Sequence, residues 1–314
     1  MFTILGGGSI GSLIAWACAK SKLEYQLILR QNSAKQLTQT IKIEPINLSK
    51  HHSSQSGEYQ NKSQVFEAAV YQFDKLIQTL VVPIKAYQVE SAIKQIAPYL
   101  TDNCTIILLH NGLGTIQTVK QYCPTANIIL ATTTHAAFQP HKYSTIQTGL
   151  GESFFGPVQL TNQYETKLLP TPAVKALMSA FKPACWDDNI QVRLWEKLAI
   201  NSVINPLTAL ANIKNGTLTQ AEYLPKIKQL VDEFCEVSEL EGFKFEPQKI
   251  LNLILTVAKN TANNYSSMNQ DIHHHRLTEI DYINGYLLKI AAKHQLVLPH
   301  HQVLFDQIKQ VETN

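Results

Sequence analysis

The sequence of 314 residues lacks the features typical of metal-binding, disulfide-rich, nucleic-acid-binding or membrane-spanning proteins. Its five cysteines lie far apart and form no Cys-x-x-Cys pair, which argues against a zinc knuckle and a disulfide framework. The net charge of +3 comes without any long basic run, which argues against a nucleic-acid partner. No stretch approaches the roughly 18 uninterrupted apolar residues that span a bilayer. We therefore expect a globular protein with reduced cysteines and neither a nucleic-acid nor a membrane partner.

The apolar N-terminus imitates a secretion signal but departs from it in two respects. Residues 1–19 are largely apolar and end in the small-residue triplet Ala-Cys-Ala. However, no lysine or arginine precedes the apolar run, and three consecutive glycines at residues 6–8 interrupt it. We therefore expect a cytoplasmic protein.

The pattern of apolar residues divides the chain into an α/β half and a helical half. Up to about residue 185, short apolar stretches alternate with helical ones, and the first 30 residues predict a βαβ unit with parallel strands. Long amphipathic stretches then follow. The sequence therefore predicts a doubly wound, Rossmann-type sheet in residues 1–187 and an all-helical domain in residues 188–314.

The expected elements are short in the first half and long in the second. Strands are expected at 2–5, 25–29, 41–43, 65–71, 76–82, 105–109 and 128–132. Helices are expected at 10–20, 89–99, 115–122, 192–210, 223–241, 247–261 and 277–294. A polar, turn-rich stretch at 45–64 is expected to be a long mobile loop, and residues 265–271 a loop with capping serines.

The motif Gly6-Gly7-Gly8-Ser9-Ile10-Gly11 fits G-x-G-x-x-G, directly after a strand and at the start of a helix. The first glycine makes the tight turn, the second lets the backbone approach a pyrophosphate, and the third allows close helix–strand packing. The same stretch also fits the G-x-S-x-G elbow of serine hydrolases, but such an elbow follows several strands, whereas here only five residues precede the motif, so we expect no hydrolase. The motif therefore predicts a dinucleotide-binding turn.

The end of the second strand indicates which dinucleotide is preferred. NAD-binding proteins typically place an Asp or Glu about 20 residues after the glycines, where it binds the ribose 2′-hydroxyl. Here the strand ends in Leu29-Arg30-Gln31-Asn32, without a carboxylate. A guanidinium at Arg30 can instead hold a 2′-phosphate. The sequence therefore favours NADPH.

A polar stripe runs along the first long helix of the second half. Lys197, Asn201 and Asn205 recur every four residues, so they share one helix face that drifts by about 40° per step over about 12 Å. Their neighbours are apolar, and buried Asn and Lys need partners that a bound oxo acid would supply. A structural helix–helix contact is the alternative.

Two further groups of residues suggest chemistry less strongly. Glu279 is expected on a helix beside apolar neighbours, where by itself it is more typical of a solvated charge. The three histidines at 273–275 point about 100° apart on a helix, so they cannot close on one ion, and no metal site is predicted.

These motifs together resemble those of the ketopantoate reductase (2-dehydropantoate 2-reductase) family over essentially the full length of the chain. The matching stretches are Gly6–Gly11, Lys85–Gln88, His110–Gly114, Thr132–Ala137, Trp195–Leu210, Ser266–Asp271 and Thr278–Gly285. The chain departs from the family at His110, where Gln is common, in the length of 45–64, and in an extra Val-Pro-Ile at 82–84. These departures leave the substrate preference open.

The resemblance implies a Rossmann domain followed by a helical domain similar to that of 6-phosphogluconate dehydrogenase, with the active site between them. It implies that Lys197 is the catalytic acid and that Glu279 is an acid facing substrate and cofactor. The implied NADPH contacts are Gly6, Gly7, Gly8, Ser9, Ile10, Gly11, Arg30, Lys85, Asn111, Ala137 and Glu279. The implied substrate contacts are Asn111, Lys197, Asn201, Asn205, Asn215 and Ser267.

The implied activity is the NADPH-dependent reduction of ketopantoate to pantoate, a step of pantothenate and coenzyme A biosynthesis. Hydride transfer leaves an alkoxide, which Lys197, with a pKa lowered by partial burial, is suited to protonate. Two alternatives remain: a reductase of another small 2-oxo acid on the same fold, and a non-enzymatic NADPH sensor. A sensor has no need of the proton donor at Lys197. A homodimer is left open.

Overall fold

The computed structural model describes residues 1–30, 37–46, 63–158 and 169–313. The predicted loop at 45–64 therefore lies mostly outside the described residues. The chain forms two compact units, the first made of residues 1–110 and 116–190, the second of residues 111–115 and 191–314. The domain boundary predicted at residues 187 and 188 stays a prediction.

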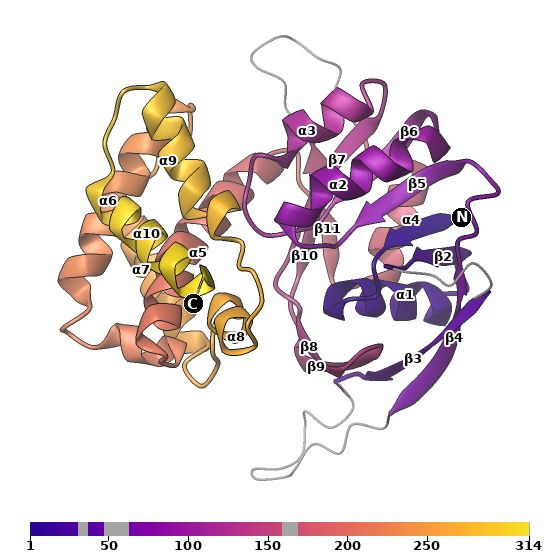
Figure 1. The fold of residues 1–314 in the computed structure, drawn as a ribbon, viewed down its shortest axis with the longest axis horizontal. Coiled ribbons are helices and arrows are strands. Elements are labelled where there is room, and N and C mark those ends of the chain that lie inside the picture. The colour runs from indigo at the N-terminus through magenta and orange to yellow at the C-terminus, as the bar shows by residue number, and fades with distance from the viewer. Residues whose placement is uncertain (31–36, 47–62, 159–168, 314) are drawn as a thin grey trace. The chain divides into compact units, whose positions relative to one another are not determined.

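The first unit is an α/β layer built on one sheet of eleven strands (Figure 1), in the order β11-β10-β7-β6-β5-β1-β2-β4-β3-β9-β8. Its strands are β1 (Phe2–Leu5), β2 (Tyr25–Ile28), β3 (Thr38–Glu44), β4 (Gln64–Val70), β5 (Ile77–Val82), β6 (Leu100–Leu108), β7 (Asn127–Thr133), β8 (Ala136–His141), β9 (Ser144–Gly149), β10 (Ser153–Pro157) and β11 (Ala184–Trp186). Its helices are α1 (Ser9–Lys20), α2 (Ala86–Ile96), α3 (Thr115–Tyr122) and α4 (Pro172–Ala180), with the 3-10 turn η2 (Ala97–Tyr99).

The centre of this sheet confirms the predicted βαβ unit. Strand β1 pairs in parallel with β2 on one side and with β5 on the other. Helix α1 connects β1 to β2 and buries Leu13, Ile14 and Ala17 in the core that also contains Ile4 and Leu27. Because the carboxyl ends of parallel strands lie at one edge of a sheet, the turn after β1 opens at the edge where such folds bind ligands.

Strands β8 to β11 were not predicted, and they enlarge the sheet at both ends. β8 and β9 form an antiparallel hairpin, and β9 also pairs in parallel with β3. At the other end, β10 pairs antiparallel with β7 and parallel with β11. β8 has no buried residue along its length, so the alternation that marks a half-buried strand is missing from it. Pairing with distant strands, rather than a local pattern, decides its conformation.

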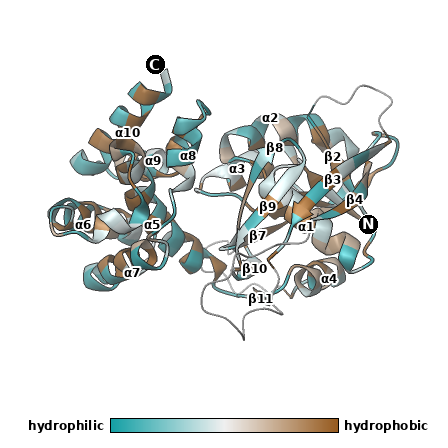
Figure 2. Ribbon diagram, turned by 90° about the horizontal axis from the view of Figure 1, so that it is seen from below, coloured by the Kyte–Doolittle hydropathy of each residue, from teal (hydrophilic) through white to brown (hydrophobic). Residues whose placement is uncertain are grey.

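The second unit is all-helical, as predicted (Figure 2 shows its helices banded in hydrophilic and hydrophobic colours, as amphipathic helices are). Its elements are α5 (Ile190–Ala211), η3 (Asn215–Thr219), α6 (Leu224–Leu240), α7 (Pro247–Asn260), α8 (Ser267–His273), η4 (Ile280–Tyr282), α9 (Asn284–Lys293) and α10 (Pro299–Thr313). Leu230, Phe234, Ile254, Leu287 and Leu304 lie in its core with no exposed surface.

Two predictions for the second unit were wrong. Residues 277–294 do not form one helix, because the short turn η4 and a break at Ile283 (φ −107°, ψ −89°) precede α9. Residues 265–271 are mostly helical rather than a loop. Helix α8 begins after Ser266, whose side chain accepts a hydrogen bond from Asn269 N and so caps the helix, the role expected of a serine there.

All five cysteines are free, and all but Cys185 are buried. None of the helices that the structure describes is long and apolar enough to cross a membrane.

Candidate functional site

The glycines at the three G positions of the N-terminal G-x-G-x-x-G motif, Gly6, Gly8 and Gly11, have distinct environments. Gly6 has φ +91° and donates its N–H to Ile28 O over 2.7 Å, so the chain turns sharply at the end of β1. A Cβ on Gly11 would clash with the carbonyl oxygen of Gly6, whereas a Cβ on Gly8 would meet nothing within 4 Å. Helix α1 begins after Gly8 without a side-chain cap from the described residues. The amides at this helix start therefore form an open cradle that fits the phosphates of a dinucleotide.

Gln139 on β8 supports this turn, and the sequence did not reveal it. Its Nε2 donates to Gly7 O over 2.7 Å and to Thr145 Oγ1 over 3.0 Å. Ser12 Oγ donates to the same Gly7 oxygen over 3.2 Å. Gln139 lies 132 residues from Gly7 on a strand without a sequence signature, so no local pattern could have identified the contact.

The other predicted cofactor contacts of the first unit lie at the ends of elements or on strand β8. Arg30 is exposed just beyond β2, next to residues 31–36, which lie outside the described chain. Lys85 is half-buried at the start of α2, where its carbonyl accepts from Gln88 N over 2.9 Å. Ala137 is half-buried on β8. Their contacts with a cofactor stay predictions.

The motif His110–Gly114 belongs partly to the second unit, and its backbone packs tightly on η4. Leu113 N donates to Tyr282 O over 2.9 Å. Gly112 has φ +79°, and a Cβ there would clash with the same Tyr282 oxygen. Only glycine fits this close approach, and the result is a fixed position for the neighbouring Asn111.

Asn111 and Glu279 meet in the second unit. Asn111 Nδ2 donates to Glu279 Oε2 over 3.2 Å. Glu279 is only 4% exposed and lies in a bend before η4, so the expectation of a solvated carboxylate on a helix was wrong. Its neighbours Ile280 and Ile283 are buried as well. A buried carboxylate requires hydrogen-bond donors or positive charge nearby.

Lys197 on α5 interacts electrostatically with Glu279. Its side chain is half-buried, and burial lowers the pKa of the ammonium group to about 8, although the charge of Glu279 acts in the opposite direction. An amine with this pKa is mainly protonated at neutral pH and still releases its proton easily. Lys197, Glu279 and Asn111 thus form a coupled polar group in a largely apolar unit.

The remaining predicted substrate residues occupy different surroundings. Asn201 is half-buried and Asn205 is 6% exposed, one and two turns after Lys197 on α5. Asn215, 7% exposed at the start of η3, donates from Nδ2 to Thr261 Oγ1 over 2.9 Å. Its Oδ1 is buried without a partner among the described residues. Ser267 is exposed at the first position of α8.

Metal ligands do not gather in the part of the chain that the structure describes. No group of three or more His, Cys, Asp or Glu side chains there is arranged to hold an ion. The three histidines at 273–275 are exposed at the end of α8 and the turn after it.

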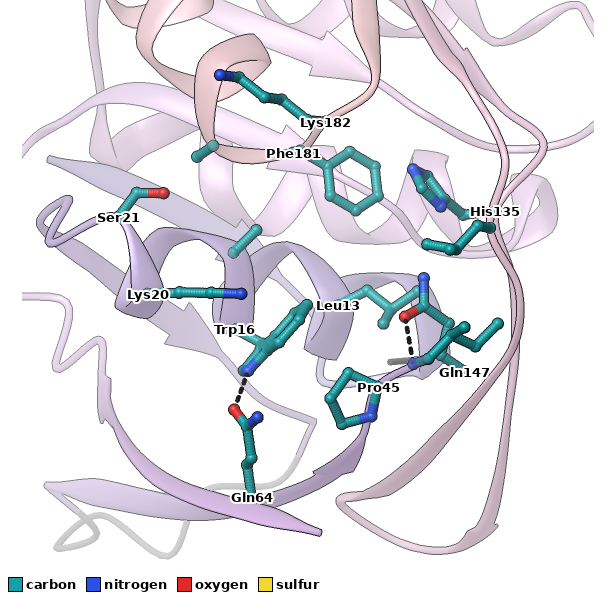
Figure 3. A pocket seen from close by; sticks show the side chains of 14 residues that line it. Leu13, Trp16, Lys20, Ser21, Pro45, Gln64, His135, Gln147, Phe181 and Lys182 are labelled. Atoms are coloured by element: carbon teal, nitrogen blue, oxygen red, sulfur yellow. Dashed lines mark hydrogen bonds between the residues drawn. The ribbon is translucent and has the colours of Figure 1, made fainter. Parts of the chain in front are cut away.

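A pocket of about 640 Å³ lies in the first unit, but not where the predicted residues meet. Figure 3 shows it between Trp16 and Lys20 of α1, the ring of Phe181 and the ring of His135. On its wall, Trp16 Nε1 donates a hydrogen bond to Gln64 Oε1 over 2.9 Å. Its described lining residues include none of the predicted cofactor or substrate contacts. It is therefore separate from the candidate site.

The fold and these groups define a class of protein, the Rossmann-type dinucleotide-binding proteins with an appended helical unit. Comparison with known proteins specifies the class further. The family model described as Ketopantoate reductase PanE/ApbA matches residues 2–159, and the model of the C terminal part of that family matches residues 189–312. The chain belongs to the ketopantoate reductase PanE/ApbA family.

Individual relatives agree with this assignment. The chain is 31% identical to the 2-dehydropantoate 2-reductase of Vibrio cholerae over 309 residues, 98% of this chain and 97% of that protein. Among solved structures, D-mandelate dehydrogenase with NADH and anilino(oxo)acetate has a TM-score of 0.86 at 20% identity and covers 100% of this chain and 98% of its own. The dimeric ketopantoate reductase from Staphylococcus aureus has a TM-score of 0.77 at 20% identity, over 100% and 99% of the two chains. At these identities the structures show the fold alone.

Proposed function

We propose that this chain is a 2-dehydropantoate 2-reductase that reduces ketopantoate to pantoate with NADPH, a step of pantothenate and coenzyme A biosynthesis. The observation that carries the proposal is the coupled group of Lys197, Glu279 and Asn111. Family membership and 31% identity to a relative of that name over 98% of the chain support the substrate.

In this proposal Lys197 is the general acid. NADPH, when bound, supplies the hydride that reduces the 2-oxo carbon. The oxygen of that carbonyl gains negative charge, and Lys197 Nζ donates a proton to it. A pKa of about 8 leaves the ammonium form in roughly tenfold excess at pH 7, which matches the acid role.

Glu279 and Asn111 set the charge around Lys197. The carboxylate raises the lysine pKa against the effect of burial, so Glu279 keeps the proton on Nζ until the alkoxide forms. Asn111 holds one carboxylate oxygen by the 3.2 Å hydrogen bond, which fixes the orientation of the acid. A sensor that only binds NADPH would have no need of this arrangement, so it favours an enzyme.

The other predicted residues have binding roles. Asn201, Asn205, Asn215 and Ser267 are proposed to orient the substrate carboxylate and hydroxyl. The unpartnered Oδ1 of Asn215 supports a role for this residue beyond its bond to Thr261. The NADPH contacts proposed are Gly6, Gly7, Gly8, Ser9, Ile10, Gly11, Arg30, Lys85, Asn111, Ala137 and Glu279.

The direct test is the oxidation of NADPH by the purified protein in the presence of ketopantoate, followed by absorbance. Pyruvate, 2-oxoisovalerate, oxaloacetate and phenylglyoxylate serve as competing substrates. The proposal expects ketopantoate to have the highest kcat/KM of the set. A higher kcat/KM for another of these 2-oxo acids would change the assigned substrate but keep the proposed reductase activity. If NADPH is oxidised with none of them, the proposed activity is rejected.

We also propose a cytoplasmic homodimer. The free cysteines support a reducing compartment, and the fold shared with the dimeric Staphylococcus aureus protein supports the assembly. Light scattering coupled to gel filtration measures the mass of the assembly directly. A monomer mass at micromolar concentration would refute the dimer without affecting the proposed reaction.

A further inference from the structure

Helix α5, which carries Lys197, Asn201 and Asn205, contains a proline in its interior. Pro206 lies within Ile190–Ala211, and the helix continues on both sides of it. A helical residue normally donates its N–H to the carbonyl four residues earlier, but proline has no N–H. The carbonyl of Ser202 therefore loses its helical partner at Pro206. Ser202 has no exposed surface, so water does not replace that partner.

Asn284 supplies the missing donor from another helix. Its Nδ2 donates to Ser202 O over 3.0 Å, and Asn284 itself is completely buried at the first position of α9. The proline ring pushes the carbonyl four residues earlier away from the helix axis, and this exposes its oxygen to a side-chain donor. The hydrogen bond thus joins α9 to α5 at the turn that contains Asn201 and Asn205.

His301 orients the amide of Asn284. His301 Nε2 lies 3.0 Å from Leu230 O, and because a carbonyl only accepts, Nε2 carries the hydrogen. In the neutral ring Nδ1 is then an acceptor, and it lies 2.9 Å from Asn284 Nδ2. Both hydrogens of the amide are used, one on Ser202 O and one on His301. The reversed amide would place an oxygen against two acceptors, so the amide has the orientation that directs Nδ2 at both of them; its Oδ1 is buried without a partner among the described residues.

The position of His301 is fixed in turn by Glu233 on α6. The Oε1 of this carboxylate accepts from His300 N over 2.8 Å and its Oε2 accepts from His301 N over 2.9 Å, so it caps the start of α10. Burial lowers the pKa of His301 to about 4, against the effect of Glu233, so the ring is neutral at physiological pH. Helices α5, α6, α9 and α10 are therefore connected through the hydrogen bonds of Asn284, His301 and Glu233.

We propose that Asn284 is a positioning residue: it replaces the hydrogen bond that Pro206 removes from α5 and so holds Lys197, Asn201 and Asn205 in register, with His301 fixing its amide. The roles of these three side chains are those given in the proposed function, on which this inference rests. Asn284 acts through helix α5 and not on the substrate, because both hydrogens of its amide are already bonded inside the core.

The test replaces the lost hydrogen bond by restoring the backbone donor. Asn284→Ala should lower kcat/KM for ketopantoate by about tenfold or more, mainly through KM, with the affinity for NADPH unchanged. In the double variant Asn284→Ala/Pro206→Ala, the new N–H at residue 206 can reach Ser202 O, and kcat/KM should return to within about threefold of wild type. The double variant still leaves His301 Nδ1 without its donor, so its melting temperature should stay below that of wild type.

The control is Ile308→Ala, which removes an equally buried side chain of α10 without removing a hydrogen bond. This variant should melt at a lower temperature and keep its kcat/KM when assayed well below that temperature. A wild-type kcat/KM for Asn284→Ala, or no recovery in the double variant, would overturn the inference. If Asn284→Ala does not fold alone, folding of the double variant supports the inference and its failure to fold overturns it.

Hydrogen exchange separates this inference from the proposed function. Peptides covering residues 198–209 should exchange faster in Asn284→Ala than in wild type, and more slowly again in the double variant. This readout needs no substrate. If the wild type does not reduce ketopantoate, the proposed function fails, while the exchange pattern still decides whether Asn284 holds α5.

Discussion

Asn111 donates a hydrogen bond to Glu279 across 168 residues of sequence, over 3.2 Å. The contact exists because Gly112 lets the chain approach the backbone of η4 more closely than any side chain would allow. Glu279 looks like an ordinary carboxylate in the sequence. In the structure it is buried, and it interacts electrostatically with the amine of Lys197, whose pKa is lowered.

Replacing Lys197 by alanine should remove the general acid and leave the fold. We expect kcat for ketopantoate to fall by roughly 10²- to 10⁴-fold, with the affinity for NADPH within about threefold of wild type. Turnover and NADPH binding by fluorescence titration measure the two effects. Lys228→Ala, an exposed lysine on α6, is the matched control and should change neither. Near-normal turnover of a folded Lys197→Ala protein would remove this residue from catalysis.

The glycine turn allows two substitutions with different expected outcomes. Gly8→Ala has room for the methyl group and an ordinary φ of −71°, so the melting temperature should hardly change. The methyl group should still keep a pyrophosphate from the helix start and weaken NADPH binding by about tenfold or more. Gly11→Ala clashes with the backbone of Gly6, so it should lower both the melting temperature and the affinity. Equal melting temperatures for the two variants would contradict this assignment.

Arg30 should decide the cofactor preference. Wild type should prefer NADPH to NADH, and Arg30→Asp should reduce or reverse the preference by about 10- to 100-fold in affinity. Lys175→Asp, an exposed residue on α4, makes the same change of charge elsewhere in the unit and should leave the preference unchanged. Comparable use of both cofactors by the wild-type protein would make Arg30 an ordinary surface residue.

How far the sequence predicts the molecule depends on the range of the interaction. The β1–α1–β2 unit and its glycine turn are local, so periodicity and spacing were enough to place them. The α5 stripe was also found, because Lys197, Asn201 and Asn205 are neighbours on one helix. The hairpin of β8 and β9 was missed, since its pairing with β3 is set by residues about 100 positions away, as the contact of Ile46 N with Gln147 shows.

The same distinction explains the error at Glu279. Its burial depends on the chain around Asn111, and a helical pattern at 277–294 hid the break at Ile283. Asn284 illustrates the point again, because its role appears only when Pro206 and His301 are placed beside it. Proline inside a predicted helix is a usable signal: it leaves one carbonyl without a donor, and the sequence does not say which side chain will supply it.

The pH dependence of turnover should show whether Glu279 sets the pKa of Lys197 or only holds Asn111. Turnover requires protonated Lys197, whose pKa is lowered to about 8, so the rate should fall as the pH rises through about 8. The charge of Glu279 raises this pKa, and therefore Glu279→Gln should lower it further and move the loss of activity to lower pH. The substitution also keeps the shape of the side chain, and Gln can still accept from Asn111.

The measurement is kcat/KM for ketopantoate against pH, for wild type and Glu279→Gln, together with their melting temperatures. We expect at least a tenfold loss at pH 7.5, a descending limb at lower pH and a change of melting temperature of only a few degrees. Glu312→Gln is not a suitable control, because that carboxylate accepts from Thr278 N over 2.7 Å and so supports the same segment. Glu236→Gln, at an exposed position on α6, changes charge by the same amount and should leave the profile in place. Superimposable profiles for wild type and Glu279→Gln would mean that Lys197 acts without the carboxylate, and that the buried Glu279 serves only to hold Asn111.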